Sequence, residues 1–122
     1  GRARPSWFPS DYDIPGLDWE VIAGDREIMP GLLAISTPGH SPGHQSLVVD
    51  LPRTGRVVLA GDVGDLRRNF EEEILPGEAA DDTAALASIR RVKALEAAGA
   101  TLFLTHDPDL LLSLRRAPLF YD

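Results

Sequence analysis

Short apolar runs separated by glycine and proline make up much of this chain. Runs of this length, bounded by turn-forming residues, predict β-strands, and the continuous ones are expected to be buried. They cover residues 32–36, 45–51, 56–60 and 101–104. Alternation at 19–23, followed by 26–28 and a Pro-Gly turn, also predicts a hairpin-like pair.

The pattern changes to a helical period after residue 80. Leu86, Ile89 and Val92 recur at three-residue spacing, which places them on one face of a helix. Asp81 or its neighbour fits the N-cap, and Gly99 stands where a helix ends. A second, short helix is predicted near residues 110–114. Strands combined with one strong helix predict an α/β or α+β fold.

Composition narrows the classes of function. A chain of 122 residues with 43% hydrophobic content is expected to form a single compact unit. The formal net charge of −7 and the isolated arginine pairs disfavour nucleic acid as a partner. No apolar run approaches the roughly 18 residues of a membrane span, so no membrane partner is expected.

The sequence contains no cysteine, which excludes thiolate ligands and disulfides. Any metal site must therefore use imidazole and carboxylate donors. The absence of cysteine also suits a reducing compartment, and we expect a cytoplasmic location. Because the sequence starts at Gly1 and residues 1–16 lack periodicity, we expect a chain entered midway.

The segment Thr37-Pro38-Gly39-His40-Ser41-Pro42-Gly43-His44 holds two of the three histidines. Proline and glycine make a tight, rigid loop that can hold an imidazole toward a site. For His40, metal ligation is favoured over a turn histidine that bonds only to backbone. His44 fits either a ligand or an outer partner that orients the loop, and the second role is favoured.

Asp62 and His106 each follow an apolar strand, as His40 does. Strand ends at one edge of a sheet converge in space, so these three residues are predicted to share a site. Taken singly, Asp62 also fits a turn former, and His106, beside Asp107 and Asp109, fits a solvated loop.

Other conspicuous residues have simpler interpretations. Glu71–Glu73 is interpreted as a solvated charged face, because adjacent side chains point in different directions. Trp7, Phe8, Trp19 and Phe70 are assigned to core or interface packing. The sequence has no G-x-S-x-G motif, which leaves a serine hydrolase without support.

The octapeptide, the pair Gly61-Asp62 and the run Leu104-Thr105-His106-Asp107 together resemble the C-terminal half of metallo-β-lactamase-fold hydrolases. The group that they resemble most is the N-acyl homoserine lactonases, and the similarity covers most of residues 19–107. The resemblance implies the C-terminal half of a four-layer αββα fold. We accordingly expect residues 1–122 to be one unit that lacks the N-terminal half of such a domain.

The resemblance also implies a metal centre. In this family the first histidine of the octapeptide binds one metal, the aspartate bridges two, and the last histidine binds the second. These roles fall on His40, Asp62 and His106, with His44 as support, and the usual metal is zinc. Two such ions polarise a carbonyl and supply a hydroxide at neutral pH.

Two departures from the family pattern stand out. The H-x-H-x-D-H motif that supplies further ligands is absent from this sequence, so the ligand set for two zinc ions is incomplete. The tyrosine that lactonases carry three residues after the bridging aspartate is replaced by Asp65, which is the candidate catalytic residue at that position.

The sequence thus predicts a fragment of a metal-dependent hydrolase whose full-length form opens the lactone ring of N-acyl homoserine lactones, which is quorum quenching. The substrate is expected to be a small ester, lactone or thioester, and the chain alone is expected to be inactive. A thioesterase of the glyoxalase II type, or another hydrolase of this fold, is an alternative. A non-catalytic module that pairs with a partner subunit is the second alternative; a homo-oligomer or a complementing half would cover its apolar face.

Overall fold

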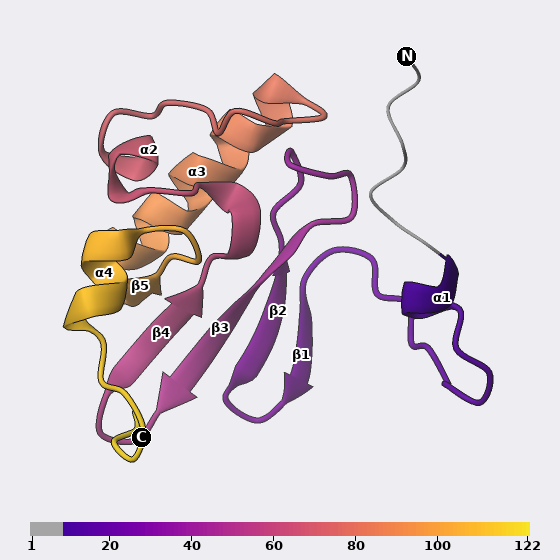
Figure 1. The fold of residues 1–122 in the computed structure, drawn as a ribbon, viewed down its shortest axis with the longest axis horizontal. Coiled ribbons are helices and arrows are strands. Elements are labelled where there is room, and N and C mark those ends of the chain that lie inside the picture. Colours follow the sequence, from indigo (N-terminus) through magenta and orange to yellow (C-terminus); the bar gives the residue numbers. More distant parts are fainter. Residues whose placement is uncertain (1–8) are drawn as a thin grey trace.

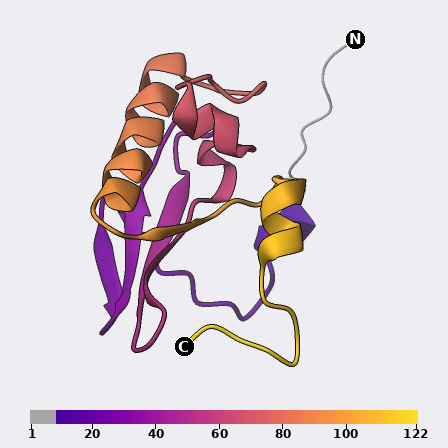
Figure 2. The same cartoon turned by 90° about the vertical axis from the view of Figure 1, so that its left-hand side faces the viewer.

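The computed structural model describes residues 9–122, which form a single mixed sheet with helices on both of its sides (Figures 1 and 2). The sheet has the order β1-β2-β3-β4-β5; the first four strands pair antiparallel, and β5 runs parallel to β4. The strands are β1 (Arg26–Met29), β2 (Leu32–Ser36), β3 (Gln45–Leu51), β4 (Gly55–Leu59) and β5 (Thr101–Phe103).

Helical segments fill the connections and the N-terminal end of the described chain. They are α1 (Pro9–Tyr12), the 3-10 turn η1 (Gly61–Val63), α2 (Arg67–Glu71), α3 (Asp82–Ala97) and α4 (Pro108–Ser113). Between β4 and β5, α3 makes the crossover that two parallel neighbouring strands require. No helix within residues 9–122 combines the length and the apolarity that a membrane crossing demands.

The predicted strands are confirmed, apart from one. β2 and β3 have the predicted bounds, whereas residues 19–23 are not a strand and β1 forms its hairpin with β2 instead. Alternation yields a strand only where a neighbour completes the backbone hydrogen bonds. Trp19 and Val21 are exposed, so a core role for Trp19 is wrong, and its role in interface packing stays a prediction. Trp7 and Phe8 lie outside the described residues.

The predicted long helix is confirmed as α3. The Asp81 side chain accepts a hydrogen bond from the Ala84 N–H at 2.9 Å, and Gly99 has a φ of +102° just beyond the helix end. Ile89 and Val92 are fully buried and belong to the core together with alternate side chains of the sheet. Those side chains are Ile35, Val48, Val58 and Leu102.

The opposite face of the sheet is only partly covered. Leu47 and Leu59 pair across β3 and β4 and remain 36% and 40% exposed. Nearer the C-terminus, the ring of Phe103 packs edge-on against Tyr121. Figure 2 shows α3 against one face of the sheet and the C-terminal segment on its other side.

One short helix and one charged run differ from expectation. The short C-terminal helix begins earlier, at Pro108, because Asp107 caps its first turn. The Glu71–Glu73 run is solvated only in part: Glu73 makes ion pairs with Arg90 (2.8 Å) and Lys93 (3.0 Å) of α3. These ion pairs lower the pKa of Glu73. Phe70, by contrast, is buried in the core as expected.

Candidate metal centre

The histidine loop between β2 and β3 is fixed against the start of α3. The carbonyl of Gly39 accepts the N–H groups of Ala80 (2.7 Å) and Asp81 (3.1 Å), and the Ser88 hydroxyl donates to the Pro38 carbonyl at 2.6 Å. A Cβ at Gly39 would lie 2.3 Å from the Ala85 Cα, and the φ of Gly39 is +139°. Glycine is therefore required for this close approach of loop and helix.

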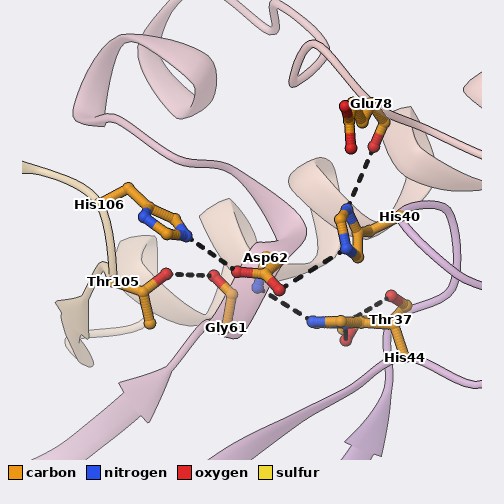
Figure 3. A network of polar contacts seen from close by, with 8 residues as sticks. All are labelled: Thr37, His40, His44, Gly61, Asp62, Glu78, Thr105 and His106. Atoms are coloured by element: carbon orange, nitrogen blue, oxygen red, sulfur yellow. Dashed lines mark hydrogen bonds and ion pairs between the residues drawn. The ribbon is translucent and has the colours of Figure 1, made fainter. Parts of the chain in front are cut away.

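His40 points from this loop toward the end of β4 (Figure 3). Its Nδ1 lies 3.1 Å from the carbonyl oxygen of Glu78. Because a carbonyl only accepts, Nδ1 donates in this contact, and in the neutral ring Nε2 is the nitrogen that keeps a lone pair. That Nε2 faces Asp62 Oδ2 at 3.7 Å.

Asp62 lies at the centre of the cluster, in the turn η1 directly after β4. Its Oδ2 faces His40, and its Oδ1 lies 3.3 Å from the Nε2 of His106 (Figure 3). The two oxygens of a single carboxylate thus face two different imidazoles. The distances are longer than those of good direct hydrogen bonds.

His44 lies beneath Asp62 and has both ring nitrogens engaged. Its Nε2 accepts the Asp62 backbone N–H at 3.0 Å, and its Nδ1 lies 3.0 Å from the carbonyl oxygen of Thr37. Burial lowers the pKa of His44, which favours the neutral ring that this pattern requires. No lone pair is left for a metal, which is the geometry expected of an orienting residue.

A buried network of hydroxyl groups supports His44 from below. The Thr37 hydroxyl lies 2.9 Å from both the His44 Nδ1 and the Ser46 hydroxyl, and Ser46 donates to the Ala60 carbonyl at 2.8 Å. Gly61 has a φ of +61°, and a Cβ there would come within 2.8 Å of the His44 Nε2. The Gly61-Asp62 pair therefore needs its glycine so that the imidazole can reach the backbone.

His106 reaches the cluster from the loop after β5 (Figure 3). Its side chain is 61% exposed. The residue after it, Asp107, is buried and accepts the N–H groups of Arg67 (2.8 Å), Asp109 (3.0 Å) and Leu110 (3.0 Å). These bonds lower the pKa of Asp107, with that from Leu110 the largest cause.

Asp107 therefore joins the loop that carries His106 to α2, which follows the Asp62 turn. Sequence reasoning noted Asp107 only as a neighbouring acid. The signal that could have identified it is Asp followed by Pro, which is typical of a helix N-cap. Three contacts of the histidines depend on tertiary packing, and no local pattern predicts them. They join His40 to the Glu78 carbonyl, and His44 to the Thr37 hydroxyl and to Gly61.

The donor chemistry of the cluster fits a metal ion of the kind expected. The structure brings His40, Asp62 and His106 together, with an imidazole Nε2 facing each oxygen of the Asp62 carboxylate. Asp65 joins them: the ligand atoms of Asp62, Asp65 and His106 all lie within 4.8 Å of one another. Imidazole nitrogen and carboxylate oxygen are ligands that zinc takes, and a bound cation would offset the clustered negative charge.

Among known proteins, this chain is similar to N-acyl homoserine lactonases. A scan against protein-family models finds no match. The chain is 34% identical to the N-acyl homoserine lactonase AttM of Azorhizobium caulinodans over 97% of its own length and 50% of that protein. It is 44% identical to an N-acyl homoserine lactonase of Bacillus cereus over 66% of this chain and 32% of that protein.

Solved structures agree with the sequence comparison. An N-acyl homoserine lactone hydrolase with N-hexanoyl-L-homoserine bound at its catalytic metal centre matches with a TM-score of 0.85 and 36% identity. That match covers 98% of this chain and 47% of the solved chain. The chain spans about half the length of the curated relatives it matches. It is thus an N-acyl homoserine lactonase-like chain that forms part of a metallo-β-lactamase fold.

Proposed function

We propose that this chain is part of a zinc-dependent hydrolase that opens the lactone ring of N-acyl homoserine lactones. In this proposal His40, Asp62 and His106 are metal ligands. The observation that carries it is the single carboxylate of Asp62, whose oxygens face an imidazole nitrogen on each side, at 3.7 and 3.3 Å. When bound, zinc would polarise the lactone carbonyl and lower the pKa of water.

The residues of this chain orient the donors. The Glu78 carbonyl accepts the Nδ1–H of His40, so Nε2 is the ring nitrogen that would bind the metal. His44 fixes the backbone of Asp62 and hence the direction of its carboxylate. Asp107 anchors the loop that presents His106. The ring of His40 is thereby directed by the protein before any cation arrives.

A centre with two zinc ions needs more donors than these three, because zinc in proteins takes about four ligands. We propose that polypeptide beyond these 122 residues supplies the rest, since the relatives are about twice as long as the matched segment. The half-exposed Leu47 and Leu59 on the open sheet face suit contact with that polypeptide. A cytoplasmic location is part of the proposal and fits the lack of cysteine.

The test uses the complete protein that the gene encodes. Purified protein is assayed with N-hexanoyl homoserine lactone, ring opening is followed by chromatography, and bound zinc is measured by mass spectrometry. We expect turnover that falls on the order of 100-fold or more in Asp62→Asn and His106→Ala, with loss of zinc. The exposed Glu71→Gln is the matched control and should retain activity.

Other outcomes identify the alternatives. Turnover of glutathione thioesters in place of lactones would replace the proposed substrate by that of a thioesterase. No hydrolysis, together with a stable complex between this chain and another subunit, would favour a non-catalytic module.

A further inference from the structure

Asp62, Asp65 and His106 form one cluster of potential metal ligands. Asp65 is the member of this cluster that has no role in the proposed function. Its carboxylate, the Asp62 carboxylate and a ring nitrogen of His106 lie within 4.8 Å of one another. The two aspartates come from one turn and the histidine from a loop some forty residues later. Two carboxylates and one imidazole are therefore gathered on the His106 side of the cluster.

The carboxylate of Asp65 is half-buried and lacks a protein partner. Among residues 9–122, none makes a hydrogen bond or ion pair with its oxygens. Asp62, its acidic neighbour, directs one oxygen to each histidine. Two carboxylates this close repel each other unless a cation lies between them.

The backbone on both sides of Asp65 is nevertheless held firmly. Gly64 is buried against the Phe70 ring, where a Cβ would come within 2.8 Å of Cε2. The Leu66 N–H donates to Asn69 Oδ1 at 2.8 Å, and the Arg67 N–H donates to Asp107 Oδ2 at 2.8 Å. The backbone thus fixes the position of a carboxylate that has no partner within the described part of the chain.

We infer that Asp65 is a direct metal ligand, which with Asp62 and His106 forms a three-donor site for a divalent cation within this chain. The inference rests on the proposed metal centre and extends it, because Asp65 adds a second carboxylate on the His106 side of Asp62. The His40 side, whose imidazole is fixed by the Glu78 carbonyl, lacks this extra acid among the described residues. The two sides therefore differ in charge, and zinc on the His106 side is held mainly by this chain.

The experiment is a calorimetric titration of the 122-residue chain with zinc ions at neutral pH. We expect one site, with affinity reduced on the order of 10-fold or more in Asp65→Asn. Asp65→His should restore most of the affinity, because imidazole is itself a zinc ligand although it carries no negative charge. Asp109→Asn is the matched control: it removes an exposed acid from the first turn of α4 without removing a donor of the cluster.

The outcomes separate this inference from the proposed function. Loss of zinc in Asp62→Asn with unchanged binding in Asp65→Asn overturns the inference and leaves the proposed centre intact. Equal weakening in Asp65→Asn, Asp65→His and Asp109→Asn shows a general charge effect, which also overturns it. Absence of any zinc binding by the chain overturns it as well, whereas the proposed function is then decided by the zinc content and turnover of the complete protein.

Discussion

The core beneath α3 and the cluster at the strand ends are built on opposite principles. In the core, Ile89 and Val58 are fully buried among apolar neighbours. In the cluster, Asp62 and Asp65 lie within 4.8 Å of each other in partly open positions, and His106 is largely exposed. Burial in the core stabilises the folded state, whereas the repulsion between the clustered carboxylates destabilises it.

The difference shows where stability and chemistry reside in this chain. Burial of apolar surface stabilises in proportion to area, and it needs no precise direction. A ligand set needs direction, which the chain provides by hydrogen bonds to groups such as the Glu78 carbonyl and the Asp62 N–H. Substitutions in the two regions should therefore separate a loss of stability from a loss of metal binding.

The largest expected effect is in the core. Ile89→Ala removes a side chain with no exposed surface and should lower the free energy of unfolding by about 2–5 kcal/mol. Urea denaturation followed by circular dichroism measures the change. Leu112→Ala, at a side chain that is 76% exposed, is the control and should change it by less than about 0.5 kcal/mol. An equal loss of unfolding free energy in Ile89→Ala and Leu112→Ala would contradict the special role of the core.

The next effect is at the junction of the two regions. Gly39→Ala places a methyl group 2.3 Å from the Ala85 Cα at a positive φ, so the histidine loop must move off α3. We expect a loss of about 1–3 kcal/mol and weaker zinc binding, measured by denaturation and calorimetry. Gly43→Ala, in the same loop with nothing within 4 Å, should behave like the wild type. Wild-type stability and zinc binding in Gly39→Ala would show that the histidine loop and α3 are not in tight contact.

A smaller effect is expected at Asp107, which is buried yet serves the cluster. Asp107→Asn loses one of three accepted N–H bonds and should cost about 1 kcal/mol. Asp81→Ala removes the side-chain cap of α3 at a similar cost of about 1 kcal/mol, at a helix that carries no ligand. Thermal melting should fall in both variants, whereas zinc affinity should fall only in Asp107→Asn. Equal zinc affinity in the two variants would make Asp107 a helix cap alone.

The smallest effect concerns acid stability away from both regions. The Arg91 guanidinium and the Ser36 N–H hold the pKa of Asp25 below its usual value. This stabilisation is complete above the unfolded pKa of about 3.9 and is lost as the pH falls through the lowered folded value. Asp25→Asn should flatten the acid limb of the stability curve by at most about 0.5 kcal/mol, because the pair is exposed.

The matching control for that pH dependence is Asp13→Asn. Its carboxylate is exposed near the N-terminal end of the described chain. Chemical denaturation between about pH 5 and pH 2 compares the variants. A curve for Asp25→Asn that coincides with the wild type would mean that the ion pair with Arg91 does not contribute in solution.

The sequence predicted much of the fold because the signals were local. The strand bounds at 32–36 and 45–51, and the cap and glycine that limit α3, follow from short patterns. Residues 19–23 alternate like a strand but lack a partner, so the prediction there is wrong. The ion pairs of Glu73 were not predicted, because its partners Arg90 and Lys93 belong to α3 and are far from it in the sequence.

The features of the candidate site also divide into those that the sequence predicted and those that only packing decides. The type and order of donors could be read from the chain, and so could the expectation that His40, Asp62 and His106 converge at strand ends. Their roles as ligands stay predictions. The proton on Nδ1 of His40 and the occupied ring of His44 could not be read, because both depend on groups that packing brings near.

By itself, the sequence determined most of the strands, where α3 begins and ends, and which residue types are available to bind a metal. These properties depend on neighbours within a few residues. Only the tertiary structure decided that the two oxygens of Asp62 face different imidazoles, that Asp107 ties the His106 loop to α2, and that Asp65 has no partner among residues 9–122. Each of these depends on distances between segments that are far apart in the chain, and only the packed sheet and helices fix such distances.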